Sequence, residues 1–90
     1  MTRRSIHPSD VVAHLEKLGY FVDHDASGKY EVFGSSEARS NYDLYMTFTP
    51  EDDGLVDWLE YWHDAAGWLD LRIGVAMQWE NKSQVVAALM

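Results

Sequence analysis

The spacing of hydrophobic and polar residues divides the chain into candidate helices and strands. In residues 7–20, apolar side chains recur with helical spacing between Ser9, a suitable N-cap, and Gly19, a residue typical of helix ends. Residues 20–33 contain two short β-rich runs on either side of Gly28, which tolerates the positive φ of a tight turn. This part of the chain therefore predicts a helix followed by a β-hairpin.

Three later segments also have clear patterns. Residues 34–41 are polar and indicate a loop, and residues 42–49 alternate apolar and polar side chains as a third strand does. Residues 69–79 show the cleanest alternation in the chain, with a bend expected near Gly74. A short helix capped by Ser83 is predicted to close the chain.

Residues 50–66 fit two different structures. Thr49 as N-cap, Pro50 as the first helical residue and the acidic residues that follow are typical of a helix start. The apolar residues with helical spacing are Leu55, Trp58, Leu59, Trp62, Ala65, Ala66 and Leu69, and Gly67 would end the helix. The alternative is a hairpin turn at Asp53-Gly54 followed by a strand. We expect the helix, because that strand would carry apolar residues on both faces.

Together these elements predict an α+β fold with two layers. The expected architecture is an antiparallel sheet of about four strands, with two or three helices packed on one face. The chain shows no internal repeat, linker or change of composition that would divide it. Residues 1–90 are therefore predicted to form a single small globular domain.

Composition adds limits on stability and location. The chain is 47% hydrophobic with four Trp, five Tyr and three Phe, which is enough apolar material for a folded core. It contains no Cys, so disulfides and thiolate metal sites are excluded. No apolar run approaches the roughly 20 residues that span a bilayer, and the N-terminal residues lack the apolar segment of a secretion signal. We therefore expect a cytoplasmic protein that does not bind membranes.

The net charge of −8 is concentrated in the second half of the chain. Residues 43–80 contain nine acidic residues and one basic residue, Arg72, whereas the remaining segments contain six of each. A surface with this charge repels nucleic acids and anionic membranes, and it attracts basic surfaces. The expected partner is therefore a basic protein surface.

On the predicted helix 50–66, four acidic residues share the face opposite the Trp side chains. Like charges four residues apart in a helix cost roughly 0.2–0.5 kcal/mol per pair, so this face is less stable than one with mixed charges. That cost favours a binding role for the face over a purely solvated one. The predicted partner-binding residues are the acidic Asp53, Asp57, Glu60 and Asp64 and the aromatic Tyr61, Trp68 and Tyr45.

The sequence contains no recognisable catalytic or metal-binding motif. Its four His have no spacing typical of a zinc site, and we expect no metal, no cofactor and no enzymatic activity. His24 lies between Asp23 and Asp25, but consecutive residues of a strand point to opposite faces. A small hydrolase that uses His24 or His63 is kept as a third hypothesis.

In size, absence of Cys and charge distribution, the chain resembles small phage-encoded anti-CRISPR and anti-restriction proteins, several of which mimic nucleic acids. The resemblance implies a non-enzymatic inhibitor, monomeric or homodimeric, whose acidic face docks on a nucleic-acid-binding protein. The alternative is an acidic interaction or immunity-type module, in which the charge serves solubility.

Overall fold

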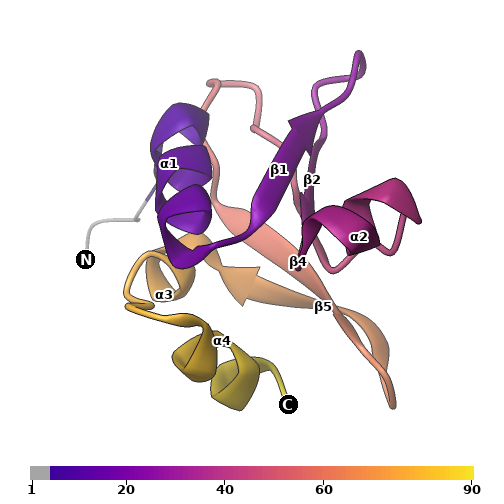
Figure 1. The fold of residues 1–90 in the computed structure, drawn as a ribbon. Helices are drawn as coiled ribbons and strands as arrows, with labels where there is room; N and C mark the ends of the chain where they lie inside the picture. Colours follow the sequence, from indigo (N-terminus) through magenta and orange to yellow (C-terminus); the bar gives the residue numbers. More distant parts are fainter. Residues whose placement is uncertain (1–4) are drawn as a thin grey trace.

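The computed structural model describes residues 5–90, which form an α+β fold around a five-stranded antiparallel sheet (Figure 1). The strands follow one another across the sheet in the order β1-β2-β3-β4-β5. They are β1 (Phe21–His24), β2 (Tyr30–Phe33), β3 (Met46–Phe48), β4 (Trp58–His63) and β5 (Gly67–Arg72). The helices are α1 (Pro8–Leu18), α2 (Ser36–Ser40), α3 (Ile73–Ala76) and α4 (Lys82–Leu89). Within residues 5–90, no helix is both long and apolar enough to cross a membrane.

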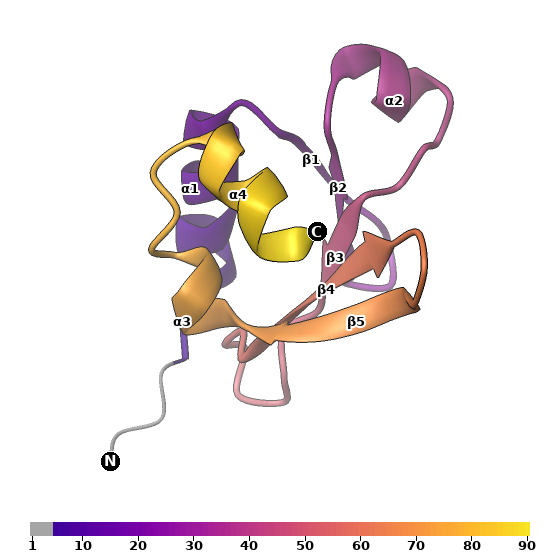
Figure 2. The same cartoon turned by 90° about the horizontal axis from the view of Figure 1, so that it is seen from below.

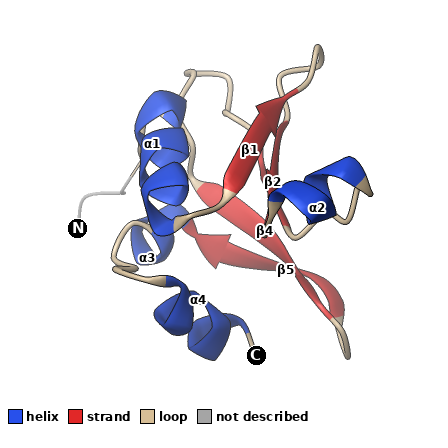
Figure 3. Ribbon diagram, viewed as in Figure 1, coloured by secondary structure: helices blue, strands red, loops and turns tan. Residues whose placement is uncertain are grey.

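The helices lie on both sides of the sheet and not on one face as predicted. Helices α1, α3 and α4 form a layer on one face, which we call the inner face, and α2 lies on the opposite, outer face (Figures 2 and 3). Helix α2 lies on the outer face because of Phe33. This residue follows Val32 in β2, so its side chain points to the outer face. Its side chain is only 1% exposed, because Tyr42 packs against it at 5.9 Å between ring centroids and α2 lies beside β2.

The hydrophobic core fills the space between the inner face and the layer of α1, α3 and α4. Alternate residues of the central strands point into it, in agreement with the period-two pattern of those segments. The buried core residues are Val11, Leu15, Tyr20, Val32, Met46, Phe48, Val56, Leu59, Ile73, Ala76, Trp79, Val85 and Leu89.

Two predicted helices are present, but the N-cap of each lies two residues before the expected one. In α1 the N-cap is His7, whose Nδ1 accepts a hydrogen bond from the Ser9 amide at 3.2 Å, and Gly19 ends the helix with φ 103°. In α4 the N-cap is Asn81, whose Oδ1 accepts from the Gln84 amide at 2.9 Å. Ser83 is therefore inside α4 and not its cap.

The predicted helix over residues 50–66 is wrong, and the hairpin alternative describes the structure. A turn at Glu51–Gly54 is closed by the Gly54 amide, which donates to the Glu51 carbonyl at 2.8 Å, and Gly54 has φ 81°. The Asp53 carboxylate accepts from the Leu55 amide within the same turn. The strand β4 then begins at Trp58. Both faces of β4 carry apolar residues, because its Trp side chains are exposed. The presence of apolar residues on both faces is the property that argued against a strand in the sequence.

Three other segments differ from their predicted form. The run over residues 69–79 is a strand only as far as Arg72, where α3 begins, because Ile73, Ala76 and Trp79 are buried with helical spacing. The polar segment 34–41 contains α2, capped by the Ser35 hydroxyl, which accepts from the Ala38 amide at 3.0 Å. The third strand is shorter than residues 42–49.

Candidate functional site

The outer face of the sheet carries a row of acidic residues that crosses all five strands. The strand register places the following residues directly opposite one another: Asp23 and Glu31, Glu31 and Thr47, Thr47 and Glu60, and Glu60 and Asp70. We call these five residues the acidic row. Neighbouring strands are about 4.8 Å apart, so each strand contributes one side chain at regular intervals. Four of the five residues are carboxylates, drawn from segments far apart in the sequence.

At the β1 end, the carboxylates of the acidic row are bound by side chains of the same chain. Arg39 of α2 binds Asp23 through two contacts, from Nη2 to Oδ1 at 2.7 Å and from Nε to Oδ2 at 3.0 Å. The Tyr42 hydroxyl donates to the Glu31 carboxylate, and this hydrogen bond raises the pKa of Tyr42 above its usual value. Glu31 and Thr47 are buried beside these contacts. Both carboxylates in the β1 half of the row therefore already have partners within the chain.

At the β5 end, the acidic row is open. Glu60 and Asp70 lie opposite each other on β4 and β5, and both are exposed. Within residues 5–90, no cationic side chain forms an ion pair with either carboxylate. Like charges directly opposite each other in a sheet are destabilising, by roughly 0.2–1 kcal/mol for a pair of this kind. This end of the row thus combines accessible charge with a cost to stability.

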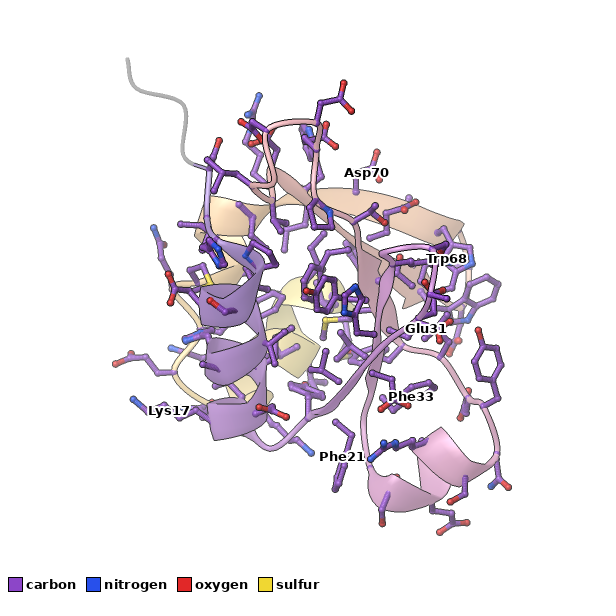
Figure 4. All side chains as sticks on the ribbon, turned by 90° about the horizontal axis from the view of Figure 1, so that it is seen from above. Lys17, Phe21, Glu31, Phe33, Trp68 and Asp70 are labelled. Atoms are coloured by element: carbon purple, nitrogen blue, oxygen red, sulfur yellow. The ribbon has the colours of Figure 1, made fainter. Side chains whose placement is uncertain are left out.

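Three Trp side chains surround the open end of the acidic row. Trp58 and Trp62 lie on β4 on either side of Glu60, and Trp68 lies on β5 next to Asp70; they are 43%, 43% and 42% exposed. Trp62 and Trp68 meet edge to face at 5.7 Å. In Figure 4, Trp68 and Glu31 lie on the opposite side of the sheet from α1 and its Lys17. Exposed aromatic residues gathered on one face make it a candidate interaction surface.

This surface already contacts one guanidinium group. The Arg72 side chain lies over the Trp58 ring, with its central carbon 4.7 Å from the ring centroid. Beside this pair is a shallow hollow of about 230 Å³, lined by Phe48, Thr49, Glu51, Trp58, Glu60 and Asp70. Three carboxylates and an indole form the chemical surroundings that suit a cation with a flat, polarisable face. We call the surface formed by Trp58, Glu60, Trp62, Trp68 and Asp70 the Trp–acid surface.

The four acidic residues predicted to share a helix face do not share a face in the structure. Glu60 is on the outer face, as described above. Asp53 is in the turn before β4, and Asp64 is in the turn after it, where its carboxylate accepts from the Trp62 indole at 3.1 Å. Asp57 is 7% exposed and accepts a hydrogen bond from the Ser5 hydroxyl at 2.6 Å. The single acidic stripe was wrong because it depended on helical spacing.

The predicted aromatic contacts also separate. Trp68 is on the surface, as expected. Tyr61 is on the inner face, half-buried against the core. Tyr45 is half-buried as well and packs against Tyr20 at 6.1 Å between ring centroids, and burial raises its pKa. Trp58 and Trp62, which the predicted helix would have buried, are instead exposed.

The two His of the third hypothesis lie in different places. His24 stacks on Tyr30 at 4.1 Å, while Asp23 is bound by Arg39 and Asp25 by the Ser27 hydroxyl at 2.6 Å. The hydrogen bonds from Ser27 and Lys29 lower the pKa of Asp25. Asp23, His24 and Asp25 are consecutive in the sequence but therefore form no cluster in the structure.

His63 lies in an open hollow of about 500 Å³. The residues that line it are Gly34, Ala38, Asp43, Leu44, Tyr45, Trp62, His63, Asp64, Ala65, Val86, Leu89 and Met90. Nδ1 of His63 accepts from the Ala65 amide at 3.2 Å. The lining contains no Ser, Thr, Cys or Lys, and burial raises the pKa of its half-buried Tyr45. Within residues 5–90, no group of three or more acidic, His or Cys side chains is arranged to hold a metal ion.

The sequence did not reveal Asp70 as a site residue. It also did not reveal the strand pairing that aligns Glu60 with acidic residues of other strands. The signal for Asp70 was present, because alternation in residues 67–72 puts Trp68, Asp70 and Arg72 on one face. Their position opposite β4 required the hairpin in place of the helix.

The chain matches no protein-family model, and it has no significant match among curated proteins or solved structures.

Proposed function

We propose that the protein is a non-enzymatic inhibitor that docks its Trp–acid surface on a basic, nucleic-acid-binding protein. The observation that carries this proposal is the open end of the acidic row, where Glu60 and Asp70 are exposed, unneutralised and framed by three exposed Trp side chains. A surface selected for stability alone would place a cation opposite one of these carboxylates. The excess negative charge of the chain steers the protein toward a basic target.

Two contacts within the chain indicate which chemical group this surface would bind. Arg39 forms a two-point contact with Asp23 at one end of the acidic row, and Arg72 lies over the Trp58 ring at the other. Guanidinium groups thus fit both the carboxylates and the indoles of the outer face. Proteins that bind nucleic acids expose arginine and lysine for phosphate contacts, and an acidic surface competes for the same groups. Blocking by occupancy requires no catalytic residues.

An acidic interaction module, or a homodimer whose charge serves solubility, is the alternative. The two functions differ in their response to salt. Docking through the Trp–acid surface on a basic partner weakens steeply as ionic strength rises, whereas a mainly apolar interface does not.

The test is affinity capture of partners from a lysate, followed by identification and a competition assay. We expect a basic nucleic-acid-binding protein that elutes at about 0.5 M salt, where the screening length falls to roughly 4–5 Å. In the competition assay, the protein should displace labelled nucleic acid from the purified partner. A partner that binds equally well at high salt, or that keeps its nucleic acid, would contradict the proposal.

Charge reversal on two different faces provides the matched control. Glu60→Lys with Asp70→Lys should remove partner binding, because both carboxylates lie on the Trp–acid surface. Glu16→Lys with Glu80→Lys makes the same change in net charge at exposed positions away from that surface, in α1 and just before α4, and should leave most binding intact. Equal loss in both double variants would indicate a response to net charge alone.

A further inference from the structure

Strand β5 leaves one edge of the sheet unpaired. Its six residues have β4 as their only strand neighbour within residues 5–90. The Trp62 amide donates to the Tyr45 carbonyl at 2.9 Å, so the backbone groups of Trp62 face β3, and Trp62 and Trp68 form a non-hydrogen-bonded pair. Backbone groups alternate along a strand, and the N–H and C=O groups of Trp68 and Asp70 therefore point away from β4. The same residues project their side chains onto the Trp–acid surface.

The opposite edge of the sheet differs in length and charge. Strand β1 has four residues, and its acidic residue in the row, Asp23, is bound by Arg39. An unpaired edge that also carries unneutralised charge is therefore found only at β5 within the described part of the chain. Exposed strand edges recruit extended segments by main-chain hydrogen bonding, and side chains then set specificity.

The charges at this edge favour one kind of added strand. A residue placed opposite Asp70 would become the next member of the acidic row, one strand beyond β5. An arginine there could contact Asp70 and Glu60 as Arg39 contacts Asp23 at the other end of the row. A second copy of the chain would instead bring another Asp70 and Glu60 to the same edge. Charge complementarity therefore favours a basic strand over self-association.

We propose that an extended, arginine-bearing segment of the partner adds to the open edge of β5 as a sixth strand, with arginines against Asp70 and Trp68. This inference rests on the proposed function and names the element of the partner that is recognised. Main-chain pairing would supply the register, and the Trp–acid surface would select arginine at alternate positions.

The probe is a fluorescein-labelled peptide in which arginine alternates with valine, and its binding is followed by fluorescence anisotropy at low salt. We expect the peptide to bind and a version with N-methylated alternate amides to bind about tenfold more weakly or worse, because N-methylation removes strand pairing but keeps the charge. A peptide with lysine in place of arginine should also be weaker, since lysine lacks the planar fork. Equal affinities of the methylated and unmethylated peptides would overturn strand addition.

Substitutions at the edge separate pairing from charge. Asp70→Ala removes the carboxylate, and Asp70→Pro removes the carboxylate and the outward-facing N–H, which the β4–β5 pairing does not use. We expect Asp70→Pro to bind the peptide more weakly than Asp70→Ala, and Glu16→Ala to bind as the unmodified protein does. Near-ultraviolet circular dichroism establishes that each variant is folded, and the methylated peptide tests the inference even if Asp70→Pro unfolds.

The outcomes distinguish this inference from the proposed function. If partner binding depends on Glu60 and Asp70 but the methylated peptide binds fully, strand addition is wrong and the acidic docking surface stands. If no peptide binds at low salt, strand addition is wrong and the partner capture decides the function. A dimer in light scattering that Asp70→Pro dissociates would show that a second copy occupies the edge, which also overturns the proposal.

Discussion

Two acidic residues three positions apart, Asp57 and Glu60, have opposite relations to stability. Glu60 is exposed and faces Asp70 across the β4–β5 pair, so its charge is unfavourable to the fold. Asp57 is buried and receives a hydrogen bond from Ser5. The sequence suggested that both were equivalent members of one exposed stripe.

This difference predicts opposite effects for the same substitution. Glu60→Lys should raise the free energy of unfolding by about 0.5–1 kcal/mol, because an opposite-charge pair replaces a like-charge pair. Asp57→Lys should lower it by about 2–4 kcal/mol, because it places a cation at a buried position and removes the hydrogen bond. Urea denaturation measures both, and each variant is the control for the change in net charge made by the other. Equal shifts would contradict the assigned environments.

Tyr20 makes stability depend on alkaline pH. The side chain is 5% exposed, and its burial, with a smaller contribution from Tyr45, raises its pKa to about 12 from 10.0. Because the folded-state pKa is the higher one, this stabilisation is complete below pH 10 and is lost as pH rises from 10 through 12. The free energy of unfolding should fall by up to about 1.4 kcal/mol per pH unit in that window.

Tyr20→Phe tests this dependence. The variant should show a flatter decline of stability between pH 10 and 12, and its phenolate absorbance should lose one of the late-titrating groups. An unchanged slope in the variant would mean that other ionisations cause the alkaline unfolding.

At the scale of elements, the helix starts show which local signals were sufficient. Asn81 and Ser83 are both good N-cap residues, and local sequence does not decide between them. The structure assigns the cap to Asn81, with an extended backbone and a hydrogen bond to the Gln84 amide.

Asn81→Ala should therefore lower stability by about 1 kcal/mol, the usual cost of removing an N-cap side chain. Ser83→Ala is the matched control, because Ser83 is exposed inside α4 and its replacement should change stability by less than about 0.5 kcal/mol. Thermal unfolding by circular dichroism compares the two. A larger effect at Ser83 would move the start of α4 to the position predicted from sequence.

At the scale of the whole molecule, the α+β class and the hairpin of β1 and β2 were predictable, and the assignment of β4 was not. Helix α1 was placed correctly apart from its first residues, whereas the strict alternation of residues 69–79 predicted one strand where β5 ends at Arg72 and α3 begins. The helix predicted for residues 50–66 was wrong because periodicity shows where hydrophobic side chains recur and not which of them are buried. Trp58 and Trp62 were counted as core residues, whereas the fold leaves them exposed.

The same misassignment hid most of the candidate site. Glu60 and Trp68 were selected from sequence, but the acidic row also depends on Asp23, Glu31 and Asp70, whose proximity follows from strand register. Register is a tertiary property that a local pattern cannot supply. The likeness in size and charge to phage-encoded inhibitors remains a hypothesis that the partner experiments will test.

The acidic row exists only while all five strands are paired in their native register. Each of its five residues comes from a different strand, so no continuous peptide of this chain reproduces it. A slip of one residue in any strand pairing would turn that strand's apolar side chains outward and break the row. An intact row therefore requires native pairing across the entire sheet. An antibody raised against its exposed end, Glu60 and Asp70, would bind a conformational epitope. Its signal would vanish with global unfolding and with a slip in the β4–β5 pairing alike.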